Sequence, residues 1–208
     1  MAGELLTIKE PVEHELVIRK SRFITNLFPV GSIEQADAAL AGIRKRFWDA
    51  NHHCTAMIVD NQQRSSDAGE PSGTAGVPML EVLHRREMTD VLAVVTRYFG
   101  GVLLGAGGLV RAYSSSVAQA LDCAQVLRRV TMLQIFVDAP IADAGRLEHV
   151  LRTWADANGG RFEGVAYDAE ARITLLIPPE KREDLGDALG RSGGPAPQAD
   201  PAEVTIDV

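Results

Sequence analysis

The chain has 208 residues, of which 46% are hydrophobic and 24% are charged, and its formal net charge at pH 7 is −7. This composition is typical of a soluble globular protein with one or two domains and enough apolar material for a core. The negative charge argues against broad, sequence-independent binding to nucleic acid, which requires a basic surface facing the phosphates. We therefore expect no DNA-binding surface, although a local arginine cluster is compatible with this charge.

The start of the chain and its cysteines predict a cytoplasmic protein. The first residues, MAGELLTIKEPVEHEL, carry acids where a signal peptide needs a basic region and a long apolar run. No apolar run approaches the roughly 20 residues that cross a bilayer. Cys54 and Cys123 are far apart and lack metal-type spacing, which is typical of a reducing compartment. We expect no membrane partner, no metal centre and no cofactor.

The first predicted elements are two strands followed by a helix. Residues 15–19 and 22–30 are rich in Val, Ile and Phe, which predicts two short strands separated by a polar break. Ser32, with Gln35 three residues later, has the pattern of a capping box. Apolar residues then recur at spacings of three and four as far as Phe47, so we predict a helix that packs on the sheet.

The next segment leads through two more strands to a long helix. Residues 53–59 predict a strand, and the polar segment 60–74 predicts a loop longer than usual. A helix is expected to begin within residues 74–78, since proline is tolerated in a first turn. The continuous apolar run 91–95 is typical of a strand covered on both faces. Helical spacing then continues from Leu109, and we expect that helix to end near Leu127.

The remainder, from Arg128, has the β-α-β-β-α-β order of a ferredoxin-like domain. We therefore predict an α+β protein with domains at 1–127 and 128–208. In this second domain we expect strands at 130–138, 162–167, 173–177 and 204–206, and helices around 147–154 and 185–189.

Glycine is concentrated between Asp67 and Tyr113. Glycine loses more conformational entropy on folding than other residues, so this density indicates tight turns or close approach to a partner. The second cluster precedes the helix that begins near Leu109, and main-chain N–H groups at such a helix start bind anions readily. It is neither a P-loop nor the dinucleotide motif G-x-G-x-x-G. The candidate anion-binding glycines are Gly100, Gly101, Gly105, Gly107 and Gly108.

Two arginines flank this glycine cluster. Arg97 follows the buried strand and Arg111 lies in the first turn of the helix. Both can point toward one opening and offer fork-shaped donors to phosphate or carboxylate. The alternatives are a tight strand-to-helix connection with packing glycines, and a structural ion pair between Arg97 and either Asp67 or Glu70.

Two further groups of side chains are candidates for chemistry. Asp67 and Glu70 lie in a glycine-rich loop, where two carboxylates can hold a hard cation or act as acid and base. The alternative is that they are solvated acids or cap the helix near Thr74. His52 and Cys54 share one strand face, so they can form a nucleophile with its base or two metal ligands. The alternative is a half-buried histidine beside a small buried cysteine.

These segments resemble the signature of the IMPACT/YigZ family. The likeness includes ANHHCTA, the DAGEPSGTAG loop and GAGGLVRAY, and it is dense over about residues 15–125. The part after residue 125 is similar only in layout to the second domain of bacterial members. The residues that carry the signature are Gly76, Met79, Leu80, Leu83, Val94, Val95, Arg97, Tyr98, Phe99, Gly100, Gly101, Leu104 and Gly105.

The resemblance implies a fold and a broad role. It implies an N-terminal ribosomal-protein-like α/β domain, as in the fourth domain of elongation factor G, followed by a ferredoxin-like domain. Proteins with this pair of folds act on ribosomes or RNA. Eukaryotic members regulate translation by competing for an activator of a starvation-responsive kinase, but they carry an extra N-terminal domain. We expect no such domain before residue 15 and do not carry that mechanism over.

Our leading hypothesis is a non-enzymatic, translation-linked protein that binds RNA, the ribosome or a translation factor through the anion site. The rival hypothesis is an enzyme acting on a small phosphorylated or carboxylated substrate, with His52, Asp67 or Glu70 as its acid, base or metal-binding group. A concave pocket that joins His52, Glu70 and Arg97 discriminates between the two, and the enzyme hypothesis fails if those side chains point apart or into the core. A third possibility is a protein-interaction module that uses the exposed sheet of the second domain.

Overall fold

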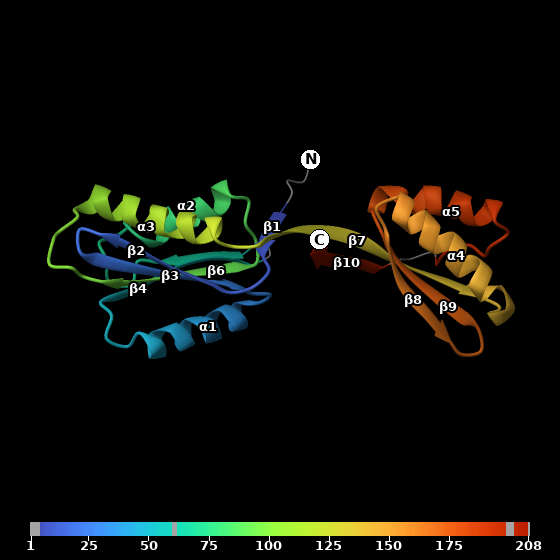
Figure 1. Cartoon of the computed structure of the whole chain (residues 1–208), viewed down its shortest axis with the longest axis horizontal. Coiled ribbons are helices and arrows are strands. Elements are labelled where there is room, and N and C mark those ends of the chain that lie inside the picture. The colour runs from blue at the N-terminus through green and yellow to red at the C-terminus, as the bar shows by residue number, and fades with distance from the viewer. Residues whose placement is uncertain (1–4, 60–61, 199–201, 208) are drawn as a thin grey trace. The chain divides into compact units, whose positions relative to one another are not determined.

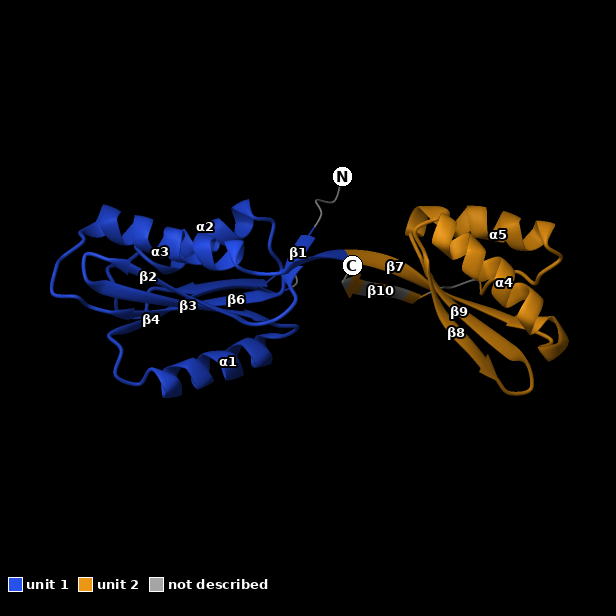
Figure 2. Cartoon of the chain, viewed as in Figure 1, with its two compact units in different colours: residues 1–129, 208 blue, residues 130–207 orange. Residues whose placement is uncertain are grey.

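The computed structural model describes residues 5–59, 62–198 and 202–207. The chain divides into two compact units, Met1–Arg129 and Val130–Asp207, which Figure 2 colours separately. Each unit has an antiparallel sheet and an apolar core of its own. The predicted α+β class is therefore confirmed. No described helix has the length and apolar character needed to cross a membrane.

The first unit is a five-stranded sheet between two helical layers. Figure 1 shows α1 (Ile33–Arg46) on one face, and α2 (Gly76–Arg85) and α3 (Ala106–Asp122) on the other. Neighbouring strands are antiparallel. The strands follow the order β2 (Val12–Ile18), β3 (Ser21–Pro29), β6 (Val91–Tyr98), β4 (His52–Val59), β5 (Gln62–Ser66).

Alternation along the central strands divides the apolar residues between the two faces. On β4, Cys54, Ala56 and Ile58 belong to the core under α2 and α3, whereas Met57 and Val59 belong to the core under α1. The predicted shared face of β4 is thus confirmed. Strand β6 is buried along nearly its whole length, as its continuous apolar run predicts.

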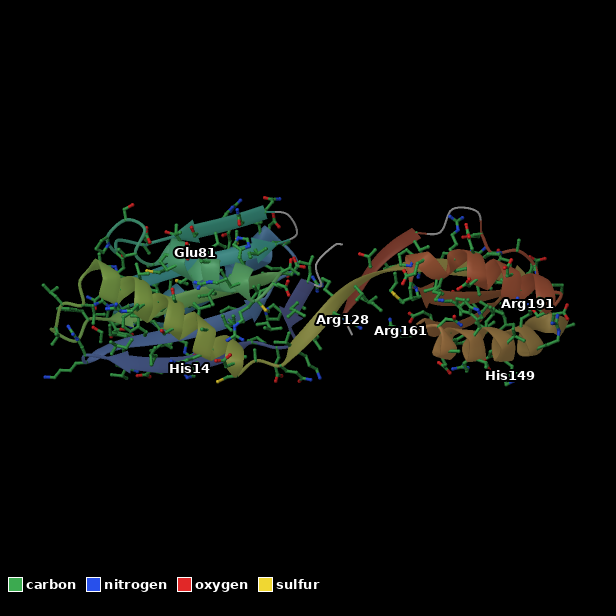
Figure 3. All side chains as sticks on the ribbon, turned by 90° about the horizontal axis from the view of Figure 1, so that it is seen from above. His14, Glu81, Arg128, His149, Arg161 and Arg191 are labelled. Carbon is green, nitrogen blue, oxygen red and sulfur yellow. The ribbon has the colours of Figure 1, made fainter. Side chains whose placement is uncertain are left out.

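Helix α1 begins at the predicted capping box. Ser32 Oγ accepts a hydrogen bond from Gln35 N at 3.3 Å, and Gln35 Oε1 accepts one from Gly31 N at 2.7 Å. On the opposite face of the sheet, Glu81 of α2 is exposed, and Figure 3 labels it in a view from above α2 and α3.

The predicted loop over 60–74 is wrong in part, because Gln62–Ser66 forms strand β5. This strand pairs with β4, and its side chains are all polar and exposed. A strand with two polar faces has no apolar alternation, so its sequence resembles that of a loop. Residues 60 and 61 lie outside the described residues.

The predicted end of the third helix near Leu127 is also wrong. Helix α3 ends at Asp122, and the chain enters β7 (Val126–Ala139). The first four residues of β7 pair antiparallel with β1 (Leu5–Ile8), a strand that the sequence did not predict. Pairing between segments so far apart in the chain does not affect the local spacing of apolar residues. That spacing alone therefore predicted Val126 and Leu127 as a continuation of the helix.

The second unit has the predicted ferredoxin-like order. Its strands β10 (Ala202–Asp207), β7, β9 (Ala171–Ile177) and β8 (Arg161–Tyr167) are neighbours in that order. Figure 1 shows α4 (Ile141–Ala157) and α5 (Arg182–Arg191) on one face of this sheet. Leucines of both helices pack on isoleucine, valine and leucine side chains of β7 and β9. The β-α-β-β-α-β prediction is therefore confirmed.

Candidate functional site

A cavity of about 470 Å³ lies in the first unit, where β4 and β6 meet the loop before α2 and the turn before α3. This volume is within the range of small-ligand pockets, roughly 300–1,000 Å³. It brings together four of the predicted site residues, His52, Glu70, Arg97 and Gly105. The other lining residues are Asn51, Gly69, Pro71, Phe99, Leu103, Leu104, Ala106 and Leu109.

The floor of this cavity contains a buried ion pair. Arg97 Nη1 donates to Glu70 Oε1 at 2.6 Å, and the Tyr113 hydroxyl donates to the same oxygen at 2.7 Å. The Glu70 and Arg97 side chains are 3% and 6% exposed. Arg97 Nη2 donates to Ser21 Oγ at 3.4 Å, and Arg97 Nε has no hydrogen-bond partner among the described residues. The ion-pair alternative for Arg97 is the arrangement found, with Glu70 as its partner.

His52 presents an acceptor atom beside this ion pair. Its Nδ1 lies 3.0 Å from the carbonyl oxygen of Ala68, and a carbonyl can only accept, so Nδ1 carries the proton. In a neutral ring with its proton on Nδ1, Nε2 has a lone pair. Nε2 lies 3.9 Å from Glu70 Oε2, which is too long for a hydrogen bond. The two atoms can both accept from a hydroxyl or amino group placed between them.

Asp67 holds together the loop that supplies Glu70. Its carboxylate accepts hydrogen bonds from the main-chain N–H groups of Gly73, Ala75 and Gly76 at 2.8–2.9 Å. Burial alone raises the pKa of Asp67, but the three amide donors outweigh it and hold the pKa below its ordinary value. Since Ala75 and Gly76 begin α2, Asp67 acts as a cap of that helix, although it lies well before the helix start. It does not line the cavity.

Asp67→Ala is expected to lower the free energy of unfolding by about 2 kcal/mol at neutral pH, because it removes the acceptor for three main-chain donors. The folded-state pKa is depressed, so this contribution is present above the unfolded pKa of about 3.9 and is lost as pH falls through the folded pKa. Urea unfolding at neutral pH and below about pH 3 measures both effects. Asp37→Ala, an exposed acid on α1, is the control. If the free energies of unfolding of wild type and Asp67→Ala differ as much below about pH 3 as at neutral pH, the capping role is contradicted.

The neighbours of His52 are unsuited to chemistry. The Cys54 thiol is buried, and its Sγ lies 3.0 Å from the Asp67 carbonyl oxygen and 3.3 Å from the Tyr113 hydroxyl, either of which can accept its single proton. Burial raises the pKa of Cys54 to about 12, so the thiol is not a nucleophile at neutral pH. His53 turns to the other face, with Nε2 3.1 Å from the Phe47 carbonyl. Among the described residues, no group of three or more His, Cys, Asp or Glu side chains has an arrangement that could hold a metal ion.

The predicted glycines have different structural roles. Gly105 has φ +71° and precedes α3, and no side chain caps that helix start. Gly105, Ala106 and Gly107 are exposed, so the amides of the first turn are not covered by side chains. Gly101 has φ +80°, which favours glycine. Gly100 lies against the main chain of Lys20 and Ser21, where a Cβ atom does not fit. Gly108 lies at the side of α3, in a second and smaller hollow.

Arg111 does not share an opening with Arg97, contrary to the prediction. It is exposed and lines the smaller hollow of about 190 Å³ together with Arg19. Arg97 turns instead under α3 into the core, where its guanidinium lies 5.3 Å from the centre of the Phe23 ring. The separation arises because one residue lies on a buried strand and the other on the outer side of a helix.

Two residues of this region escaped sequence reasoning. Tyr113 was not among the candidate site residues, yet its hydroxyl donates a hydrogen bond to Glu70. A buried tyrosine needs a partner for its hydroxyl, and that rule was the available signal. Asn51 accepts a hydrogen bond from Phe99 N at 2.8 Å through Oδ1 and so fixes the wall of the cavity. No sequence pattern indicates that contact.

Comparison with known proteins places the cavity inside a shared region. Residues 19–121 match the Impact N-terminal domain. The protein named IMPACT family member YvyE of Bacillus subtilis (strain 168) is 47% identical over 155 residues, which are 73% of this chain and 71% of that protein. The IMPACT family member YigZ of Escherichia coli (strain K12) is 50% identical over 169 residues, 79% and 81% of the two chains. A crystal structure described as that of a hypothetical protein covers 100% of this chain and 98% of its own, with 30% identity and a TM-score of 0.62.

Proposed function

The chain belongs to the IMPACT family, and from this premise we propose that it is a cytoplasmic, translation-linked regulatory protein that binds RNA, the ribosome or a translation factor. The family resemblance supports this role, because it implies a pair of folds used by proteins that act on ribosomes or RNA. Fold likeness does not establish function by itself, so the proposal also depends on the site.

The observation that carries the proposal is the uncapped start of α3. Gly105 and Ala106 line the cavity, and Gly105, the N-cap residue, has no side chain that could cap the first turn. The helix has 17 residues, and its dipole and unpaired N–H groups favour a phosphate or carboxylate there. Arg97 lines the same cavity, but its charge is offset by Glu70. The main-chain amides therefore make the proposed contact on this side, and Arg111 adds positive charge further along α3.

Arg111→Ala is expected to weaken binding to purified ribosomes or structured RNA about two- to fivefold at low salt, the range of one exposed ionic contact. Its melting temperature should equal that of wild type, because the side chain is exposed. Wild-type binding should also weaken as salt rises, since phosphate contacts release counterions. Co-sedimentation across a salt series measures both effects. Arg44→Ala, an exposed arginine on α1 at the other face of the sheet, is the control.

The absence of wild-type binding to ribosomes and structured RNA at low salt would contradict the RNA and ribosome forms of this proposal. A pull-down from cell lysate with and without nuclease treatment then tests the translation-factor form, because a direct protein partner survives the nuclease.

A second candidate function is an enzyme acting on a small phosphorylated or carboxylated substrate. The cavity that joins His52, Glu70 and Arg97 supports this candidate, whereas the burial of Glu70 and Arg97 in an ion pair with each other counts against it. His52 Nε2 and Glu70 Oε2 lie 3.9 Å apart, and groups of these two types can act as acid and base on a substrate hydroxyl or amine. The two functions differ in the role of His52. In the co-sedimentation experiment, His52→Ala should bind ribosomes as wild type does if the histidine acts only in catalysis.

A further inference from the structure

The smaller hollow, of about 190 Å³, lies beside the cavity and shares one wall with it. Leu104 lines both. The hollow is bounded by the end of β2, at Ile18 and Arg19, and by α3, at Gly108, Arg111 and Ser115. Arg19 and Arg111 are both exposed. Two guanidiniums from elements far apart in the sequence therefore meet at one small depression.

The cations around this hollow are not neutralised by the protein. Among the described residues, no carboxylate forms a salt bridge with Arg19, Lys20 or Arg111. Arg22 on the same hairpin provides a contrast, because it donates two hydrogen bonds to Glu15 at 2.7 and 3.0 Å. Arg19 and Arg111 therefore bring to this hollow two cations that have no ion-pair partner among the described residues, in a chain whose net charge is −7.

The hairpin fixes the main chain from which Arg19 and Lys20 project. Arg19 and Lys20 are the residues between β2 and β3, and their φ angles are +47° and +68°. Such turns favour asparagine and glycine, so local preference does not explain the arginine and lysine here. Gly100 packs directly on the main chain of Lys20 and Ser21, and its N–H donates to Ser21 Oγ at 3.1 Å. This contact ties the turn to the segment that leads into the cavity.

We propose that this hollow binds the phosphate of a single-stranded RNA segment, and that the adjoining cavity takes a neighbouring base against Phe99. The inference rests on the proposed function and narrows its partner. Guanidiniums match phosphate oxygens in geometry and charge. Phe99 lines the cavity and is 46% exposed, and the Arg97 guanidinium lies 5.7 Å from the centre of its ring. Exposed aromatic rings are stacking platforms for unpaired bases.

The polar atoms of the cavity suit the edge of such a base. Glu70 Oε2 is an acceptor, as is His52 Nε2 in the neutral ring with its proton on Nδ1, and the amino and imino groups of bases are donors. Bases in a duplex are stacked and paired, so only a single strand can place one in the cavity. Leu104 lines both depressions, so a phosphate in the hollow and a neighbouring base in the cavity lie on either side of one residue.

Fluorescence anisotropy with a short labelled oligouridine, over about 50 to 200 mM salt, tests this inference on the full chain. Arg19→Gly removes a charge and suits the positive φ, so the fold is preserved. Arg19→Gly and Arg111→Ala should each weaken binding about two- to fivefold and reduce the salt slope by about 0.7, the value of one single-strand phosphate contact. Phe99→Ala should weaken binding at least fivefold, as expected for a lost base stack worth about 1 kcal/mol or more, with an unchanged salt slope. Arg44→Ala should match wild type.

The outcomes separate this inference from the proposed function. If wild type binds ribosomes or RNA and the Arg19 and Arg111 variants bind equally well, the hollow is not the phosphate site, and the proposed function stands. Equal affinity for a duplex of the same length overturns the single-strand assignment. Binding of polyglutamate but not of RNA, lost in both arginine variants, overturns it in favour of an acidic protein partner. No binding of oligouridine, structured RNA, ribosomes or polyglutamate overturns the inference together with the RNA and ribosome forms of the proposed function.

Discussion

Glu70→Ala is expected to lower the free energy of unfolding by about 3–5 kcal/mol, the typical effect of removing one partner from a buried ion pair. The substitution leaves the Arg97 guanidinium in the core without a counter-charge, since both side chains are almost fully buried. It also removes the acceptor of the Tyr113 hydroxyl, and an unsatisfied buried donor is costly in itself. Urea unfolding followed by circular dichroism measures the change.

An exposed ion pair in the same unit provides the matched control. Glu15 and Arg22 form a two-point contact with side chains 40% and 50% exposed, so Glu15→Ala should cost less than about 1 kcal/mol. The loss of unfolding free energy in Glu70→Gln should lie between those of Glu70→Ala and Glu15→Ala. The amide oxygen of the glutamine still accepts a hydrogen bond from Tyr113, but the negative charge is lost. If Glu70→Ala proves as mild as Glu15→Ala, water must reach Arg97 and the cavity floor is not the dry ion pair described above.

The fold was predictable where one face of an element is apolar. The alternation on β4, the apolar run of β6 and the element order of the second unit all follow from burial, which marks the sequence directly. Strands β1 and β5 escaped for different reasons. β5 has no buried side chains, so only its pairing with the adjacent β4 defines it. β1 is defined by its pairing with the distant segment Val126–Arg129.

The candidate site was predictable in its residue types but not in its pairings. Sequence spacing placed Glu70 and Arg97 near one opening and allowed their ion pair, which is the arrangement found. It also placed Arg111 at that opening, because position in a first helical turn does not say toward which neighbour the side chain projects. Arg111 lies beside Arg19, a residue of a hairpin turn that no motif singled out. A local cluster of cations from different elements can therefore be found only in three dimensions.

Gly100→Ala is expected to destabilise the protein by about 3 kcal/mol or more, the upper range for overpacking a core. The added Cβ would lie well under 3.0 Å from main-chain atoms of Lys20 and Ser21. A flexible side chain could rotate away from such a clash, but here both sides of the contact are main chain. The clash is therefore relieved only if the β2–β3 hairpin moves away from the segment after β6. This movement also breaks the hydrogen bond from the Gly100 N–H to Ser21 Oγ. Urea unfolding and thermal melting measure the effect.

Gly107→Ala is the control that isolates this contact from a general effect of replacing glycine. No heavy atom lies within 4 Å of a Cβ built at Gly107, and its φ is not positive. Alanine also restricts the unfolded chain, so this variant should be more stable than wild type by about 0.4–1 kcal/mol. A loss of stability in Gly100→Ala together with a gain in Gly107→Ala follows only if Gly100 is required for close packing and Gly107 is not. Equal stability of the two variants would show that the hairpin does not press on Gly100, and the fixed main-chain position of Arg19 and Lys20 would lose its basis.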